Sequence, residues 1–269
     1  MPSYTSWWLR RHLVLGGRRP AELRTADADP LLAGLYDKAS PAIASALADP
    51  AVARALGVRT SLAGLLAEPG GPDELLHGMA DQERPVARAQ LRSLWAALAA
   101  TAEITTAEVT PPDRVRAVRG DEVVVADADE VLVLDRPDLW PLAAGVPLVL
   151  APCELAPRLA DLLDLPLASE EVAGLIESSG QRRPVPPVVQ AVLPAAPAAY
   201  PAHDRLMVDG LEVPWRYLGG EVHASGPQGL ACGLAWAAGR WQLRHVLAAL
   251  LTAPDATAQL LADADLDPI

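Results

Sequence analysis

The stretch HDRLMVDGLEVPWRYLGGEVHASGPQGLACGLAWAAGRWQLRHVLAALL, residues 203–251, decides most about the fold of this chain. Two glycine-containing dipeptides, Asp209-Gly210 and Gly219-Gly220, each separate two short runs rich in β-forming residues. The four runs are 206–208, 211–213, 215–218 and 221–224. Such dipeptides favour the two-residue turns of β-hairpins. The stretch therefore predicts two successive hairpins, joined into a three-stranded β-meander.

A long apolar helix is predicted to follow the hairpins. The Gly226-Pro227 pair suits its first turn, because a first-turn N–H has no partner inside the helix and proline lacks that group. Residues 230–238 are apolar all round, which predicts a buried segment. Beyond them, apolar side chains gather on one side of the helix, and Arg240 and Arg244 lie on the other. The prediction is one long helix packed against the meander.

The middle of the chain predicts a small α/β unit. Strand-like runs at 115–118 and 122–125 flank a Gly-Asp turn. Over 131–165 the predicted order is strand, helix, strand, helix, which is typical of a parallel βαβ unit. Residues 181–202 are proline-rich and extended, and only 188–193 is expected to pair as an edge strand.

The first part of the chain predicts helices. Prolines recur near the start of Ala/Leu-rich segments, where a helix tolerates them, and the strongest helix is expected over 85–102. The fold class is therefore α+β. Four parts are predicted, namely a helical domain 1–112, a small α/β unit 113–180, a proline-rich connection 181–202, and the β-meander with C-terminal helices 203–269.

The composition bounds the class of protein. Hydrophobic residues make up 51% of the 269 residues and charged residues 21%, which indicates a globular rather than a disordered chain. The net charge is −12, but the first 24 residues carry five arginines against one glutamate, a local +4, which leaves −16 for the remainder. Non-specific nucleic-acid binding needs clustered cations, so an acidic body of this kind argues against it.

The sequence also predicts a cytoplasmic protein without a membrane span. The N-terminus lacks the apolar core of a secretory signal. The longest uncharged run, 184–202, contains six prolines and cannot form a regular transmembrane helix. The two cysteines, Cys153 and Cys232, lie far apart among apolar residues, as expected for buried thiols in a reducing compartment.

Residue types that could carry chemistry are present, but not in the spacing of a known site. None of the five histidines has a histidine or cysteine partner at metal-ligand spacing, so each is predicted to be structural. A run of carboxylates lacks the glycine and the final glutamate of a calcium loop, and it is interpreted as solvated turn residues. Its members are Asp127, Asp129, Glu130, Asp135 and Asp138. No cofactor or metal is predicted.

The glycines at 226, 229 and 233 leave an alternative open. They lie where a strand enters a helix, and helix N-termini bind phosphate through free N–H groups. The spacing matches neither a dinucleotide fingerprint nor a P-loop, so a tight turn with close helix packing is the preferred interpretation. His223 and Cys232 straddle this turn, but a buried apolar thiol keeps its proton and is inert. The alternative function is a small-ligand or phosphate-binding domain, or an enzyme, that uses the turn 226–233.

A protein-interaction surface is predicted at the N-terminus. Trp7 and Trp8 are adjacent, and adjacent helical side chains point about 100° apart, so one core rarely buries both. An exposed tryptophan is a frequent anchor of protein interfaces. The candidate contact residues are these two tryptophans and the neighbouring arginines Arg10, Arg11, Arg18 and Arg19. The alternative is that both rings pack between neighbouring helices while the arginines form a solvated face.

Three stretches carry a family resemblance: SYTSWWLRRHLVLGGRRPAELR, LLDLPLASEEVAG, and VDGLEVPWRYLGGEVHAS followed by GLAWAAGRWQLRHVLAALL. They resemble the C-terminal region of large actinobacterial proteins that begin with a sacsin-like, Hsp90-type ATP-binding domain. In that family the nucleotide site lies in the N-terminal domain, whose asparagine-bearing helix and DxGxG motif have no counterpart here. The resemblance therefore implies a non-catalytic protein-interaction or scaffold region of a chaperone-like ATPase system, with a protein partner or self-association.

Overall fold

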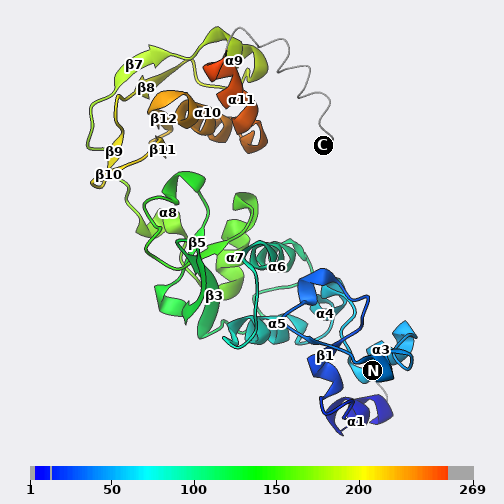
Figure 1. The fold of residues 1–269 in the computed structure, drawn as a ribbon. Helices are drawn as coiled ribbons and strands as arrows, with labels where there is room; N and C mark the ends of the chain where they lie inside the picture. Colours follow the sequence, from blue (N-terminus) through cyan, green and yellow to red (C-terminus); the bar gives the residue numbers. More distant parts are fainter. Residues whose placement is uncertain (1–3, 13, 254–269) are drawn as a thin grey trace. The chain divides into compact units, whose positions relative to one another are not determined.

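The computed structural model describes residues 4–12 and 14–253; of the side chains in helix α1, those of 5–7 and 11 are not described. The chain forms two compact units (Figure 1). Unit 1 comprises Met1–Asp135 and Ala144–Glu171, and unit 2 comprises Arg136–Ala143 and Val172–Ile269.

This division differs from the predicted one. The helical region 1–112 and most of the α/β unit belong together in unit 1, and the proline-rich residues 181–202 are part of unit 2 rather than a connection. The fold is of the α+β class, as the sequence predicts.

Short helices build the first part of unit 1, in agreement with the sequence. They are α1 (Tyr4–His12), α2 (Pro41–Ala44), α3 (Pro50–Leu56), α4 (Leu62–Leu66), α5 (Gly71–Ala80) and α6 (Arg88–Ala100), with a two-stranded parallel sheet of β1 (Leu23–Arg24) and β2 (Asp37–Lys38). A proline occupies the first turn of α2, α3 and α5. Helix α6 buries Leu91, Leu94, Trp95 and Leu98 along one face, which confirms the helix predicted over 85–102 with slightly shorter bounds.

A four-stranded sheet completes unit 1. Its order is β4-β3-β6-β5, with β3 (Arg114–Arg119), β4 (Glu122–Asp127), β5 (Leu132–Leu134) and β6 (Leu148–Leu150). Strands β3 and β4 form the predicted hairpin, and β5 pairs with β6 in parallel, so the predicted parallel pair is confirmed. Two α-helices follow β6, namely α7 (Ala156–Leu163) and the short α8 (Ala168–Glu171).

Unit 2 is built on a second four-stranded sheet, of order β11-β12-β8-β7. Its strands are β7 (Gln181–Pro184), β8 (Ala199–Ala202), β11 (Trp215–Leu218) and β12 (Glu221–Ala224). Both predicted hairpins form, but the three-stranded meander does not, because β9 (Met207–Val208) and β10 (Leu211–Glu212) make a separate two-stranded sheet. Val208 and Val213 pack in a small cluster of their own with Leu206, so this hairpin turns to a different core from that of β11 and β12.

The segment between β7 and β8 also differs from the prediction. Residues Pro187–Val192 form helix α9 instead of an edge strand. Pro186 and Pro187 supply the fixed backbone of a first helical turn, and Val189 is buried against the helices of unit 2. The apolar run 188–193 was too short to distinguish a strand from a helix by periodicity alone.

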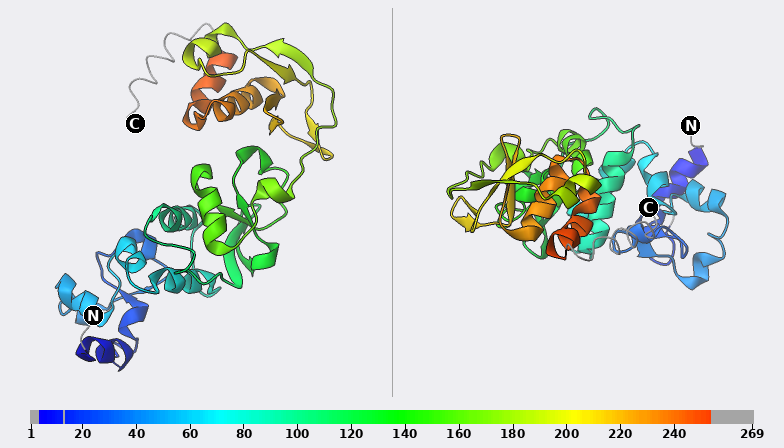
Figure 2. Two further views of the ribbon diagram at one scale, coloured as in Figure 1. Left: turned by 180° about the vertical axis from the view of Figure 1, so that it is seen from behind. Right: turned by 90° about the horizontal axis from the view of Figure 1, so that it is seen from above.

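The long C-terminal helix is broken into α10 (Gly226–Ala237) and α11 (Arg244–Thr252). Gly239 adopts a left-handed φ of +65°, and the N–H groups of Gly239 and Arg240 return to the carbonyls of Trp236 and Ala235. A glycine in this conformation with such backward hydrogen bonds is a common helix stop. Helix α10 packs against β11 and β12, and α11 packs against α10 (Figure 2).

Candidate functional site

The most elaborate side-chain chemistry lies on the face of the unit 2 sheet opposite α10. Successive side chains of a strand point to opposite faces. Trp215 and Val222 therefore pack towards the helices, while Arg216 and His223 point away from them. Arg216 lies opposite His223 in the register of β11 and β12, and the backbone N–H of His203 donates to the carbonyl of Ala224, the last residue of β12. We call the row Arg216, His223 and His203 the polar face.

One end of the polar face is a buried ion-pair network around Asp138. The side chain of Asp138 has no exposed area, and that of Arg216 is 2% exposed. Asp138 Oδ2 lies 2.5 Å from Arg216 Nη1 and 2.9 Å from Arg136 Nη2, and it also accepts the backbone N–H of Tyr217 at 3.0 Å. Charge-assisted hydrogen bonds of this kind satisfy a carboxylate that burial would otherwise penalise.

This network corrects one interpretation of the sequence. Asp138 was expected to be a solvated turn residue like the other carboxylates of its run. Instead it forms ion pairs with two arginines, and Arg136 also donates to the backbone carbonyl of Tyr217 in β11. Asp129 and Glu130 are exposed, as expected of turn residues. The sequence places Arg136 near Asp138, but it does not show that Asp138 is buried, because the buried partner Arg216 is 78 residues away.

The other end of the polar face is a hydrogen-bonded chain of one serine and two histidines. Ser178 Oγ lies 2.9 Å from His203 Nδ1, and His203 Nε2 lies 3.1 Å from His223 Nδ1. The Met207 N–H donates to Ser178 Oγ at 3.1 Å, which leaves the serine hydroxyl hydrogen available for His203. One proton arrangement then satisfies every group: Ser178 donates to His203, and His203 donates to His223.

The hydrogen-bonded row of Ser178, His203 and His223 is held in place by its surroundings. His203 is only 6% exposed, and a Cβ atom placed on Gly180 would lie 2.6 Å from His203 Nε2, so the ring needs a glycine beside it. Burial lowers the pKa of His203. Burial and the neighbouring His203 lower the pKa of His223, with Glu221 acting in the opposite direction. Both imidazoles are therefore neutral at neutral pH, and they can pass or accept protons.

Sequence reasoning placed both histidines among structural residues and did not connect them. Positions 178, 203 and 223 lie in three separate segments, and no spacing rule links them. The only local indication of a site is the alternation in β12: Val222 is apolar and faces the helices, so the next residue, His223, points to the opposite face of the sheet. Among the described residues, no group of three or more His, Cys, Asp or Glu side chains could hold a metal ion.

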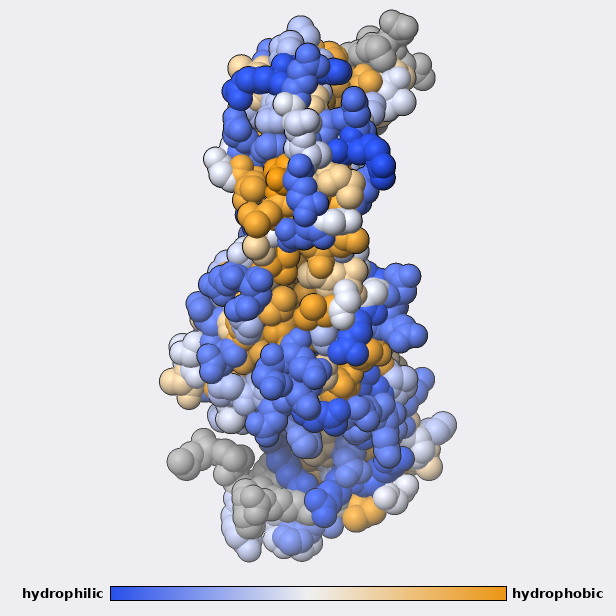
Figure 3. Space-filling view, turned by 90° about the vertical axis from the view of Figure 1, so that its left-hand side faces the viewer, coloured by the Kyte–Doolittle hydropathy of each residue, from blue (hydrophilic) through white to orange (hydrophobic). Residues whose placement is uncertain are grey.

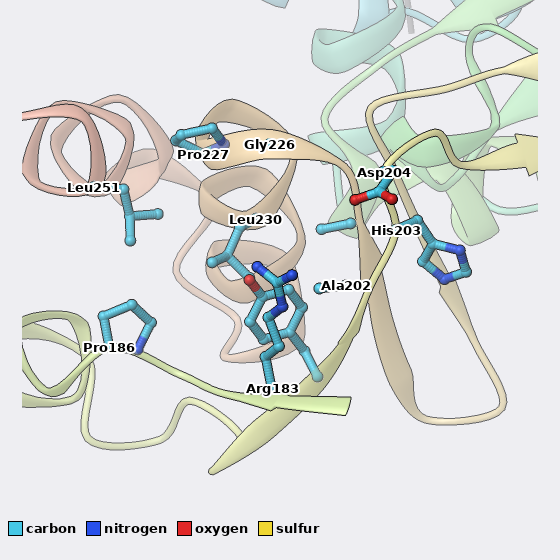
Figure 4. Close-up of a pocket in the computed structure, with 11 residues that line it drawn as sticks. Arg183, Pro186, Ala202, His203, Asp204, Gly226, Pro227, Leu230 and Leu251 are labelled. Carbon is cyan, nitrogen blue, oxygen red and sulfur yellow. The ribbon is translucent and has the colours of Figure 1, made fainter. Parts of the chain in front are cut away.

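The glycine turn borders a cavity of about 410 Å³ on the helix side of the sheet (Figure 4). Arg183 reaches into it towards Leu230, and the ring of His203 points away from it. Of the glycines at 226, 229 and 233, only Gly226 lines the cavity. A Cβ on Gly229 would lie 1.8 Å from the Pro214 carbonyl oxygen, and one on Gly233 would lie 2.3 Å from Val222 Cγ1. Two of the three glycines therefore serve close helix packing, as the preferred interpretation has it.

The possible His223/Cys232 pair does not form. His223 points away from α10 and bonds to His203, whereas Cys232 lies on α10 at the edge of the apolar core. Burial raises the pKa of the Cys232 thiol, with Arg244 acting in the opposite direction. The thiol thus keeps its proton, and both cysteines are free of disulfides.

The N-terminal contact residues divide into exposed and engaged groups. Tyr4, Trp8 and His12 recur every four residues and form one exposed stripe along α1, with Trp8 46% exposed and its ring centroid 5.0 Å from that of His12. We call these three residues the α1 stripe. The side chains of Trp7 and Arg11 lie outside those that the structure describes.

Arg10 and Arg18 are engaged within unit 1. Arg10 Nη2 donates to the Arg54 carbonyl at 2.7 Å and its Nε to the Ala55 carbonyl at 3.3 Å, so it closes the last turn of α3. Arg18 pairs with Asp37 at 2.9 Å. The Arg19 backbone N–H donates to Glu22, and its side chain is exposed. The structure therefore gives two of the four arginines a role inside the fold.

Two further large apolar side chains are exposed, one on the β9–β10 hairpin and one beside it. Figure 3 shows the side of the molecule that lies at the left in Figure 1, with patches of hydrophobic residues on it. The large exposed side chains here are Leu211, at 48%, and Leu175, whose carbonyl accepts the Asp209 N–H.

Comparisons of the chain with protein-family models, with curated proteins and with solved structures found no match in any of the three. In the described part of the chain, no helix has the length and apolar character needed to cross a membrane.

Proposed function

We propose that this chain is a non-catalytic protein-interaction or scaffold region of a cytoplasmic, chaperone-like (sacsin/Hsp90-type) ATPase system, and that the α1 stripe is its contact surface. The observation that supports the proposal is the exposure of Trp8 between two further aromatic side chains on one helix face. The link to an ATPase rests on the resemblance of three sequence stretches. Any ATP turnover belongs to a separate domain or partner.

The α1 stripe has the properties of an interface anchor. Tryptophan and tyrosine dominate binding hot spots because they bury a large area with few rotatable bonds. Contact with His12 holds the Trp8 ring in place before binding, so association has less side-chain entropy to overcome. Helix α1 is in turn fastened to α3 through Arg10, which presents the stripe on a fixed support.

The partner that the charge distribution fits is a second copy of the chain. The first 24 residues carry +4 and the remainder carries −16, so the N-terminal region of one copy attracts the acidic body of another. Arg19 belongs to this basic N-terminal region, and its side chain is exposed. Complementary charge of this kind gives orientation and association rate, while the aromatic residues supply affinity.

Sedimentation velocity over a range of protein concentrations tests the proposal. The chain is expected to self-associate, and Trp8→Ala to weaken the association constant about 30-fold or more, the loss of a hot spot of about 2 kcal/mol. Leu211→Ala is the matched control, because Leu211 is exposed to a similar degree in a different unit. Arg19→Glu should weaken association at low salt and have a smaller effect at high salt.

A chain that stays monomeric at every concentration, or that associates equally well with Trp8→Ala, would contradict the proposal. Arg10 and Arg18 are left unchanged in this experiment, because their replacement would break contacts inside unit 1.

A further inference from the structure

A groove in unit 1 follows one face of α5, and its opposite wall is the segment 103–114. The wider part, of about 690 Å³, lies between the second half of α5 and residues 110–114. The narrower part, of about 380 Å³, lies between residues 66–73 and residues 103, 104 and 108. The two parts share Asp73, which accepts the backbone N–H of Thr110 at 2.8 Å and its hydroxyl at 3.3 Å. We call both parts together the α5 groove.

The wider part of the α5 groove has an apolar lining. Leu76 and Ala80 supply it from α5, and Pro111 and Pro112 supply it from the opposite wall. Proline has no backbone N–H, so an aromatic ring can cover Pro111 and Pro112 without burying an unpaired donor. This part of the groove therefore suits a flat apolar side chain.

Carboxylates accompany this apolar lining. Six of them line the two parts against one guanidinium, that of Arg114, so the lining carries a net charge of −5 when His77 is counted as neutral. The six are Glu68, Asp73, Asp81, Glu103, Glu108 and Asp113. Glu103 and Asp113 are exposed, and in the described part of the chain neither forms an ion pair. The groove therefore attracts a basic partner.

The α1 stripe has the complementary chemistry. Trp8 offers a large flat ring, and its indole N–H needs an acceptor when the ring is buried. The region around it, residues 1–24, carries a charge of +4. An apolar centre with a polar rim is the usual anatomy of a protein interface, and here the prolines supply the centre and the carboxylates the rim.

The orientation of α1 keeps the stripe away from the groove of its own copy. Arg10 lies at the narrow part of the groove, with its Nη1 3.5 Å from Glu68 Oε2. Side chains two positions apart on a helix point about 160° away from each other, so Arg10 and Trp8 occupy opposite sides of α1. The face of α1 that reaches the groove is therefore the one without the stripe, and the stripe is left for a second copy.

We propose that the α1 stripe of one copy docks in the α5 groove of another, with Trp8 against Pro111 and Pro112 and the basic N-terminal region along the carboxylates. This inference rests on the proposed function and adds the surface that receives the stripe. Stripe and groove are different surfaces, so the contact is heterologous. Its repetition builds a ring or an open chain of copies rather than a symmetric dimer.

Mixing two variants of the full chain tests the docking by sedimentation velocity. Asp113→Lys reverses a charge in the groove and should weaken the association constant roughly five- to tenfold at low salt and less at high salt. Asp129→Lys is the matched control, because it makes the same change at an exposed carboxylate that does not line the groove, and it should leave the constant within about twofold.

The decisive sample is an equimolar mixture of Trp8→Ala and Asp113→Lys. The first variant keeps an intact groove and the second an intact stripe, so the mixture should associate with the constant of the unsubstituted contact. It should also stop at two copies, because the remaining stripe and the remaining groove are both altered. A stripe-to-stripe contact would give no such recovery, since every pair in the mixture that involves Trp8→Ala lacks one anchor.

The docking is overturned if Asp113→Lys associates like the unsubstituted chain, or if the mixture associates no better than the variants alone. The proposed function stands in both cases, provided that Trp8→Ala weakens association. A chain that does not self-associate overturns both proposals.

Hydrogen-exchange mass spectrometry of the unsubstituted chain at low and high concentration decides the matter even if a variant fails to fold. Association should protect the amides of α1 and those of the segment 103–114 together. Protection of α1 alone contradicts docking in the α5 groove.

Discussion

Unit 1 and unit 2 each contain a buried arginine that is paired with carboxylates. The two units differ in how far those carboxylates are buried and in how far away they lie in the sequence. In unit 1, Arg59 is 8% exposed and pairs with Glu68 and Glu74, whose side chains are 29% and 36% exposed. In unit 2, Arg216 pairs with the wholly buried Asp138. The partners of Arg59 lie 9 and 15 residues away, whereas Asp138 is 78 residues from Arg216.

The difference teaches how far each cluster depends on the rest of the fold. Burial lowers the pKa of Arg59, but the charges of Glu74 and Glu68 outweigh this and raise it overall. Burial and the nearby Glu74 raise the pKa of Tyr36, whose hydroxyl donates to Glu74 at 2.8 Å. Two carboxylates reached by water make this cluster tolerant of losing one member. The cluster around Arg216 has one carboxylate, which water does not reach. Loss of this carboxylate should therefore leave the guanidinium buried without an anion and strongly destabilise unit 2.

Asp138→Asn should have the largest effect on stability. It leaves Arg216 buried without its anion, and breaking a buried pair in this way costs about 3–5 kcal/mol. Denaturation followed by hydrogen-exchange mass spectrometry measures unit 2 separately from unit 1. The control is Asp129→Asn, an exposed carboxylate of the same run, which should stay within about 0.5 kcal/mol. Equal effects of the two changes would remove the distinction between the clusters.

Helical glycines extend the comparison from polar groups to packing. Gly229→Ala in α10 would place a Cβ 1.8 Å from a backbone carbonyl oxygen, so unit 2 should lose about 1–3 kcal/mol. Gly78→Ala in α5 meets no atom closer than Leu35 Cδ2 at 4.0 Å, and unit 1 should gain about 0.5–1 kcal/mol from the better helix former. Thermal unfolding of the two variants checks the opposite signs; a gain in both would show that α10 can move away from Pro214.

Glu74→Gln should have the smallest destabilising effect. Glu74 is more than a third exposed, and Arg59 keeps Glu68 at 2.9 Å, so the expected loss is about 1 kcal/mol. Urea denaturation at low and high salt measures it. If Glu74→Gln lowered the free energy of unfolding as much as Asp138→Asn, the Arg59 cluster would depend on each carboxylate as strongly as the Arg216 cluster does, and the proposed difference would be wrong.

The parts of the fold that follow from adjacent residues were predictable. Asp209-Gly210 and Gly219-Gly220 mark both hairpins, and the prolines at 41 and 50 mark helix starts, because turn chemistry and helix capping act over a few residues. The break at Gly239 was missed because apolar periodicity resumes after it, and a glycine inside a helical pattern is ambiguous.

The candidate sites also contain features that adjacent residues suggest and features that depend on residues far away in the sequence. Helix geometry suggested that one core rarely buries two adjacent tryptophans, but it left open whether both rings pack; the structure shows Trp8 exposed, and the Trp7 side chain lies outside those described. The engagement of Arg10 with α3 was not predictable, because its acceptors are backbone carbonyls more than 40 residues away. Neither were the polar face and its histidine chain.

By itself, the sequence determined the class of fold, both hairpins, the parallel strand pair and the lack of a familiar catalytic motif. These depend on turn residues, periodicity and spacing, which are local quantities. Only the tertiary structure decided that β8 lies parallel beside β12, so that His203 meets His223. It also decided that residues 136–138 lie against β11, so that Asp138 meets Arg216. The core of unit 2 joins apolar side chains from β11, β12, α9, α10 and α11, so the arrangement of its strands depends on contacts between segments that are distant in the sequence.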